Sequence, residues 1–496
     1  MMLNTRWAES RLKPLWLTLG ILCLPGGAFA QTISLENFLQ LVRANQPAYA
    51  REALRPQIEA LRRDAFLGAQ DISLAMTPFY ILQHPLAQGT FTPEQVSQIS
   101  AGTRLEKALW RTGGRLSLSW TSDFTDQTIQ QLDIPGFGTI SGGPPKFYQN
   151  NLALTYTQPL LQNFGGELDR LGYEMGQFNV SIAALQATEN RESFLLDMAL
   201  RFIDWVTLGE QRQIASERLD LARRQLNQVT EKWAANLVDR VDVLRSEDAQ
   251  RIAEQGVVIL DARWMAKQAE LAVLTRSTEL AQSAPAMDLY ARLEQRPLET
   301  YLAIINEQSR PLKVLRARSG QLERQQRGLA ELTRPQLYLN AQLSLKGGAA
   351  ELGSAFGMDK SDAGLFLQFN YPLGNRVALT NLQKNRLQQR GLALDRDALR
   401  LRLEAQLRSL LIQIIEMEKV LVLNEQQIKT AGERTAAEEA RYLQGRGDLA
   451  FVIQSQDSEA AARLAYVGNA ASYQRLGLQL RALIDEIEPA GIPGKD

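Results

Sequence analysis

The chain has almost no cysteine or histidine and no excess of charge. Its 496 residues include one cysteine, Cys23, and one histidine, so no cluster of these residues has zinc-site spacing. No P-loop and no GxSxG motif is present. We therefore expect no catalytic residues, no metal and no other cofactor, and we do not expect an enzyme. Lysine plus arginine equals aspartate plus glutamate at 55 each, so no net field favours nucleic acid as a partner.

Long apolar runs are also missing. No stretch approaches 18 consecutive apolar residues, so no transmembrane helix is expected. Residues 1–30 instead have the features of a secretory signal peptide: a basic start, an apolar stretch from Leu15 to Leu24, and the cleavage motif Ala28-Phe29-Ala30. Cys23 lies inside this segment, so the exported chain would have no cysteine and no disulfide. If it enters a membrane, we expect it to do so as β-strands.

What the chain does have is a heptad seam between Arg376 and Gln444. Apolar side chains recur there at alternating steps of four and three, the 3.5-residue period of helices that supercoil left-handed. The seam positions are Leu403, Leu407, Leu410, Ile414, Met417, Leu421, Asn424, Ile428 and Ala431. This helix would be roughly 100 Å long. The glycines of Gly445–Asp448 predict a turn, after which a second helix returns to Ile487.

Four runs alternate between apolar and uncharged polar residues: Leu116–Thr121, Leu152–Thr157, Leu337–Leu345 and Leu365–Tyr371. The pattern is typical of strands in an outer-membrane barrel, and equally of a half-buried soluble sheet. The signal peptide favours the membrane. Two further candidate strands, near Ile72–Leu82 and Thr103–Trp110, either enter such a barrel or form a hairpin beside it. The segments Asp123–Asn151 and Lys346–Asp362 are rich in glycine and are predicted to be surface loops.

The predicted elements recur in the same order in two halves. Ser34–Leu39, which opens a helix expected to be kinked or broken by prolines 47 and 56, resembles Pro297–Leu302. Each strand pair ends at a proline, Pro159 or Pro372, and a long helix follows. We predict a tandem duplication. The predicted divisions are the signal peptide (1–30), the first repeat (31–282), a linker (283–296), the second repeat (297–488) and a tail (489–496).

One copy of such a chain is incomplete. Four strands cannot close a barrel, and open sheet edges do not persist in lipid. The helices also carry apolar seams that a single chain cannot cover. A closed ring of identical chains would satisfy both demands, either as two chains with eight strands or as three chains with twelve.

The sequence resembles the TolC-like outer membrane efflux proteins. The resemblance rests on the signal peptide, the duplication, the junctions Gln158-Pro159 and Tyr371-Pro372, and the spacing Tyr442-x-x-Gly445…Val452-Ile453-x-Ser-Gln456. It implies an α+β membrane protein, a homotrimer whose 12-stranded outer-membrane β-barrel continues into a long periplasmic coiled-coil barrel of helices. It further implies a passive exit duct of a tripartite efflux or type I secretion system. Substrate would arrive from an inner-membrane pump of the RND or ABC type through a periplasmic adaptor.

The resemblance also implies roles for the two helical turns. Asn236 and Leu237 in the first turn, and Gly445, Arg446, Gly447, Asp448 and Leu449 in the second, would contact the adaptor. Asn236 stands where the family usually has glycine, and asparagine tolerates positive φ. Asp242 would belong to an acidic ring at the periplasmic gate. Phe451 and Gln454 replace acidic residues common in the family, which implies a weaker ring and an aromatic side chain in the constriction.

Two other classes of protein share parts of this pattern. A periplasmic adaptor has one long helical hairpin, flanked by a small β-rich domain. A trimeric surface adhesin has its barrel at one terminus and a continuous coiled-coil stalk. Here two helical hairpins are predicted, each after a strand pair, and the strands interrupt the helices twice. This order favours the exit duct.

Overall fold

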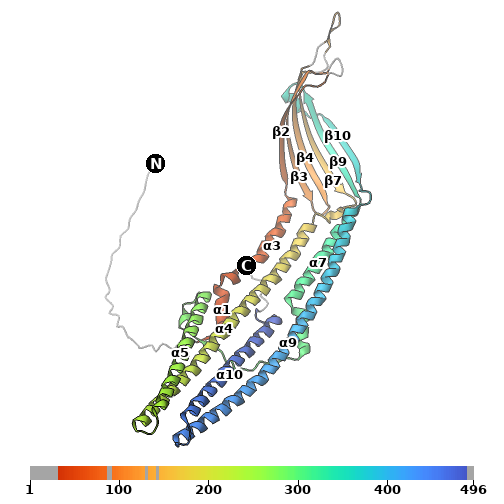
Figure 1. The fold of residues 1–496 in the computed structure, drawn as a ribbon. Coiled ribbons are helices and arrows are strands. Elements are labelled where there is room, and N and C mark those ends of the chain that lie inside the picture. The colour runs from red at the N-terminus through yellow and green to blue at the C-terminus, as the bar shows by residue number, and fades with distance from the viewer. Residues whose placement is uncertain (1–31, 87–91, 129–131, 141–143, 489–496) are drawn as a thin grey trace, which may run out of the picture.

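The structure is a computed structural model that describes residues 32–86, 92–128, 132–140 and 144–488. The predicted signal peptide (1–30) and tail (489–496) lie outside the described residues. A β-sheet stands at one end of a long layer of helices, and two helical hairpins form the other end (Figure 1). None of the described helices combines the length and hydropathy needed to cross a membrane.

Six long strands form one antiparallel sheet in the order β10-β9-β7-β4-β3-β2 (Figure 1). Their bounds are β2 Ser73–Gln83, β3 Gln95–Leu109, β4 Gly114–Thr128, β7 Lys146–Pro159, β9 Gln336–Ala349 and β10 Lys360–Asn370. The four predicted runs are β4, β7, β9 and β10. The two runs whose place was left open are β2 and β3, and they pair with the others in the same sheet. The count of four strands per chain is therefore too low.

The sheet has one apolar and one polar face, because directly paired residues project to the same side. One cross-strand row on the apolar face contains Leu74, Leu105, Leu118, Leu154, Leu343 and Ala363. The neighbouring row on the polar face contains Ala75, Arg104, Ser119, Ala153, Ser344 and Asp362. The burial is inverted relative to a soluble sheet. On the inner strands β7 and β9, Leu154 and Leu343 are 42% and 50% exposed, whereas Ala153 and Ser344 are each 4% exposed.

The loop predicted from Asp123 to Asn151 is wrong at both ends. β4 and β7 stay paired as far as Asp126 and Lys146, and the rings of Phe124 and Tyr148 lie 4.6 Å apart between them. Cross-strand packing thus extends the ladder into a segment whose composition indicates a loop. A small hairpin, β5 Leu132–Ile134 and β6 Gly138–Ile140, lies beyond it. Similarly, β9 runs to Ala349, and the short α8 Leu352–Ala355 precedes β10.

The helix predicted after Ser34 is present in three pieces. Ser34, the last residue of β1 Thr32–Ser34, caps α1 Leu35–Asn45, since its Oγ accepts a 3.3 Å hydrogen bond from the backbone N–H of Asn37. Proline 47 begins α2 Pro47–Glu52, as expected for the first helical position. The interruption expected near proline 56 is present, because α2 ends at Glu52 and a new helix begins at Leu54. Proline 56 itself lies in the first turn of α3 Leu54–Ala65, where no intrahelical N–H bond is lost.

Four long helices form the layer in the order α5-α4-α10-α9 (Figure 1). Their bounds are α4 Leu171–Ala234, α5 Arg240–Thr275, α9 Arg376–Leu443 and α10 Leu449–Leu483. α9 has 68 residues, which corresponds to roughly 100 Å. Toward the sheet, where α10 has ended, α7 Arg310–Glu331 packs against both α4 and α9, and α3 packs on α4. α6 Leu298–Gln308 precedes α7, and the short β8 Ala284–Ala286 pairs with β1.

The predicted seam of α9 faces the core. All nine seam positions are buried or half-buried. α10 covers them, and the buried side chains there include the small Ala470 and Ala471 beside Tyr473. The core continues into α4 and α1 through aromatic contacts. The ring centroids of Phe38 and Phe202 lie 5.1 Å apart, and those of Phe202 and Trp205 5.8 Å.

The predicted linker packs on this core. The Gln474 side-chain amide of α10 donates to the carbonyl oxygens of Leu289 at 3.0 Å and Ala291 at 2.8 Å.

The two outer helices each carry a second apolar seam that the chain leaves uncovered. On α5, Ile259 and Val273 lie 14 residues apart and are 51% and 76% exposed. On α9, Leu387, Leu394 and Leu401 recur at steps of seven and are between 65% and 69% exposed. The same period that buries one face of α9 therefore leaves another open at the edge of the layer.

Candidate functional site

The candidate site is the pair of helical turns at the end of the molecule farthest from the sheet (Figure 1). Asn236 has φ 54° and Gly445 has φ 71°, so each turn contains one left-handed residue just after its helix. The next residue then bonds back across the last turn. Leu237 N donates to Lys232 O, and Arg446 N donates to Arg441 O, both at 2.9 Å. Both turns are Schellman motifs. The expectation that Asn236 adopts positive φ is confirmed.

Charged and aromatic side chains tie the two turns to each other. The Lys232 ammonium of α4 lies 4.1 Å from the ring centroid of Tyr442 of α9, within the range of a cation–π contact. The Arg245 guanidinium of α5 lies 3.4 Å from an oxygen of Asp242 and 3.6 Å from an oxygen of Asp448. Asp448 also caps α10 by accepting a 2.8 Å hydrogen bond from Ala450 N. Between the turns lies a cleft of about 1120 Å³, here called the tip cleft, which these side chains line.

The Tyr442 hydroxyl is the buried polar group of this cleft. Within the described part of the chain it has no hydrogen-bond partner. Burial raises the pKa of this phenol, and the charges of Asp242 and Asp448 raise it further. The group therefore remains a neutral donor throughout the physiological range.

The predicted gate residues do not gather in one place. Asp242 is half-buried in the tip cleft and paired with Arg245, so it is not a free carboxylate. Gln454 lines a second cleft, between α5, α4 and α10. Phe451 is 58% exposed and lines neither cleft.

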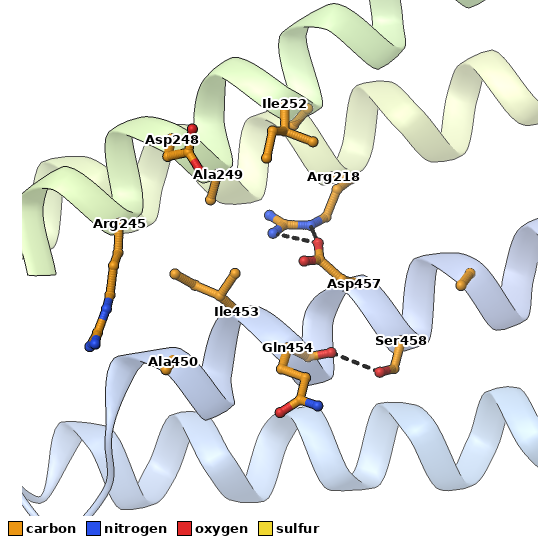
Figure 2. A pocket seen from close by; sticks show the side chains of 12 residues that line it. Arg218, Arg245, Asp248, Ala249, Ile252, Ala450, Ile453, Gln454, Asp457 and Ser458 are labelled. Atoms are coloured by element: carbon orange, nitrogen blue, oxygen red, sulfur yellow. Dashed lines mark hydrogen bonds and ion pairs between the residues drawn. The ribbon is translucent and has the colours of Figure 1, made fainter.

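The second cleft, shown in Figure 2, has a volume of about 630 Å³ and a largely apolar wall that includes Ile252 and Ile453. At one end the Arg218 guanidinium of α4 lies 2.8 Å from an Asp457 oxygen of α10. This pair is the first of three between the same helices. Arg463 lies 3.0 Å from Glu217, and Arg475 lies 2.6 Å from Asp204. The three pairs connect α10 to α4 along their shared length.

The predicted junctions Pro159 and Pro372 lie where the sheet meets the helices. Pro159 ends β7, and Leu160 N still donates to Leu337 O at 2.8 Å. Pro372 follows β10, and its carbonyl accepts a 3.1 Å bond from Asn375 N, just before α9. The backbone is tightly packed here. Gly166 has φ 70°, and a Cβ on it would lie 1.8 Å from the carbonyl oxygen of Trp110.

Three carboxylates elsewhere lie close enough together to hold a metal ion: Glu189, Glu192 and Asp485. Arg310, at the start of α7, already lies among them. Its guanidinium donates to Glu192 and lies 3.5 Å from Asp485 and 3.8 Å from Glu189. Burial raises the pKa of Glu189 and of Asp485, while the Arg310 charge opposes the rise in both. This cluster is therefore an internal ion-pair network that joins α4, α7 and the segment after α10.

No protein-family model and no curated protein matches the chain. Solved structures do. The outer membrane protein VceC of Vibrio cholerae matches with a TM-score of 0.63 at 12% identity, covering 92% of this chain and 96% of that one. CusC, whose structures were described in connection with transmembrane channel formation, matches with a TM-score of 0.66 at 10% identity and coverages of 92% and 93%. The open state of the MtrE outer membrane channel of Neisseria gonorrhoeae matches with a TM-score of 0.54 at 15% identity and coverages of 92% and 89%.

This chain has the fold of the TolC-like outer membrane efflux proteins. The resemblance drawn from the sequence is thus confirmed for the fold, and so is the α+β class.

Three residues of the two helical turns were not singled out as site residues from the sequence: Lys232, Tyr442 and Arg245. Lys232 and Tyr442 contact each other from two different helices, and Arg245 contacts Asp448 of the other hairpin as well as Asp242 of its own helix. The only signal in the sequence was a basic or aromatic residue within one turn of a predicted helix end.

Proposed function

We propose that the protein is the outer membrane exit duct of a tripartite efflux or type I secretion system, a passive channel with no catalytic role and no cofactor. The observation that carries the proposal is the inverted burial of the sheet. In its inner strands the leucine-rich face is more exposed than the serine-rich face, the arrangement that lipid outside and water inside require. The fold shared with VceC, CusC and MtrE supports it.

The proposed working unit is a homotrimer. Four helices per chain form a layer, so three copies would supply a coiled-coil barrel of twelve. The two outer helices support this closure, since the exposed seam of α5 on one copy would pack on the exposed seam of α9 on the next. The sheet edges β2 and β10 lie on the same two sides of the chain as α5 and α9 (Figure 1). One neighbour would therefore cover both. We also retain the proposed tandem duplication of residues 31–282 and 297–488, joined by 283–296.

The proposed location is the outer membrane, with the helices extending into the periplasm. Outer membrane lipid would contact the apolar face of the sheet, and the cleavable segment 1–30 would direct export. A periplasmic adaptor would bind the helical tips (Asn236, Leu237, Gly445, Arg446, Gly447, Asp448 and Leu449), and an inner-membrane pump of the RND or ABC type would supply substrate and energy. No nucleic acid takes part.

The periplasmic gate is proposed to lie at the tip cleft. The Arg245 contact to Asp448 links the two hairpins of one chain, so separating the hairpins requires this ion pair to break, while Asp242 holds Arg245 from the same helix. Asp242 would supply a weak acidic ring whose charge Arg245 partly neutralises. Phe451, which is exposed in the single chain, would narrow the constriction, with Gln454 one turn further along α10.

The test is to fractionate membranes and examine the detergent-extracted protein by heat-modifiable migration together with chemical crosslinking. We expect the protein in the outer membrane fraction, a shift in migration on heating, and crosslinked species up to three chains. A monomer released by osmotic shock would contradict the proposal and favour a periplasmic adaptor. Cleavage of the helices by protease added to intact cells would instead favour a surface adhesin.

A further inference from the structure

The β2–β3 hairpin continues an apolar row and a polar row of the sheet. The row that begins at Leu74 and Leu105 on the apolar face joins leucines of β4, β7 and β9. On the opposite face, the row through Arg104 joins serines and an alanine. A slip of one residue in the pairing would move the apolar side chains of the hairpin to the other face. The observed register therefore favours a hairpin that is part of the barrel wall over one that lies beside it.

The two edges of the sheet are matched to each other. β2 and β10 have 11 residues each, and every residue of both strands is exposed. Because six strands alternate in direction, β2 and β10 run antiparallel to one another. Copies arranged in a ring would therefore bring two free edges of equal length and opposite direction together. Open edges of this length are not tolerated in lipid.

We propose that β10 of each copy pairs with β2 of the next along all 11 residues, so that three copies close a barrel of 18 strands. This inference rests on the homotrimer of the proposed function. It replaces the 12-stranded barrel, which counted four strands per chain.

The register of the closing pair follows from the registers within the chain. A row perpendicular to the strands leads from Ser73 through four partners to Gly364. If the 11-residue edges pair over their full length, Gly364 lies opposite Phe79 of the next copy, six residues beyond Ser73. Each copy thus contributes six strands and a shift of six residues, so the shear number of the closed barrel equals its number of strands. That relation gives a strand tilt of about 36°, inside the range of roughly 35–45° for outer-membrane barrels.

The faces also agree in this register. Met76 would lie opposite Leu367, and Tyr80 opposite Ala363, which continues the apolar face across the junction. Pro78 donates no hydrogen bond, so the closing ladder has at most one bond fewer than its length allows. At a tilt of about 36°, 11 residues span roughly 29 Å along the barrel axis, enough for a hydrocarbon core of about 30 Å.

The consequence is a wide barrel. With strands about 4.8 Å apart and tilted by about 36°, 18 strands enclose a backbone diameter of roughly 34 Å, against roughly 23 Å for 12 strands. The size limit for cargo then lies in the helical barrel and its tips rather than in the membrane. Any cargo narrow enough to pass through the helical barrel would also pass through the membrane barrel.

The test is disulfide crosslinking in the full-length protein with Cys23→Ser, which leaves no other cysteine. Ala75→Cys with Gln368→Cys places two thiols opposite each other across the proposed junction, on the polar face. The comparison variants combine Gln368→Cys with Ser117→Cys or Ser119→Cys on β4. β4 would be the edge strand of a 12-stranded ring but stands about 14 Å from β10 of the neighbour in an 18-stranded one, beyond the reach of a disulfide.

We expect interchain disulfides, resolved as linked dimers and trimers on non-reducing gels, from the Ala75 pair and not from the two β4 pairs. Disulfides from a β4 pair instead, or from no pair while the protein still migrates as a trimer, would overturn the 18-stranded barrel. Absence of any trimer in the unmodified protein would be a failure of the proposed function and not of this inference.

Discussion

Replacing Arg310 by methionine tests the ion-pair network between α4, α7 and the segment after α10. Arg310 is 6% exposed and Glu192 3% exposed, and the guanidinium also donates to the Glu488 carbonyl oxygen at 2.8 Å. Methionine fills similar space but removes the ion-pair partner of Glu192 and leaves Asp485 the charge of Lys313. Removing one partner of a buried ion pair costs about 3–5 kcal/mol. At this chain length that corresponds to a fall of about 4 °C in the unfolding midpoint.

The loss of stability caused by Arg310→Met, measured as the fall in the unfolding midpoint, should depend on pH. Burial raises the pKa of Glu189 and Asp485 in the folded state, and loss of the Arg310 charge raises both further. Such groups stabilise the fold below their unfolded pKa, and this stability is lost as pH rises through the folded pKa. The loss of stability relative to the native protein is therefore smallest near pH 4, about the unfolded pKa of a carboxyl group. It grows as the pH rises toward neutral.

The assay is thermal unfolding in detergent, followed by helical circular dichroism at one fixed protein concentration, because assembly changes the midpoint. Arg223→Met is the matched control, since Arg223 is half exposed and its contacts to Asp220 and Glu254 are 3.7 and 3.9 Å long. We expect that control to lie within about 1 kcal/mol of the native protein. A second change, Glu192→Gln, should restore part of the lost stability. A deficit that is the same at every pH, or that Glu192→Gln deepens, would refute the reasoning.

Three further predictions concern the tips and the seam. Arg245→Ala breaks both of its ion pairs, and we expect at least a twofold rise in single-channel conductance in planar bilayers; unchanged conductance would remove Arg245 from the gate. Asp242→Ala should lower the cation preference read from the reversal potential in a salt gradient, and an unchanged potential would place Asp242 outside the passage. Leu394→Glu puts a charge on the exposed seam of α9 and should leave mostly monomers by native mass, whereas Gln388→Glu should leave trimers.

The long helices could be predicted because one period governs tens of residues. The seam from Leu403 to Ala431 gave the buried face of α9 correctly, and the glycines after it gave the turn. The exposed seam of α9 follows the same rule with residues seven apart, yet nothing in one sequence says which of two seams faces the chain's own core. That choice depends on α10, whose small residues at 470 and 471 allow the closer approach.

The sheet was predicted only in part. Four strands alternate cleanly, but β3 carries Arg104 and Glu106 on its polar face and Lys107 on the other, which weakens the alternation. β2 is almost continuously apolar, so its period is hidden. Which side chains of β2 and β3 lie on the apolar face of the sheet becomes clear only from the pairing of β2 with β3 and of β3 with β4. The links Lys232–Tyr442 and Arg245–Asp448 could not be predicted for a related reason, because each joins two helices whose stagger is set by contacts elsewhere.

The most direct test is electron microscopy of the detergent-extracted complex viewed end-on, which shows whether the chains assemble into a closed ring. We predict three-fold particles with a central hole and a long stem. Compact single copies without detergent or lipid, with the leucine-rich face of the sheet buried inside the same chain, would contradict it.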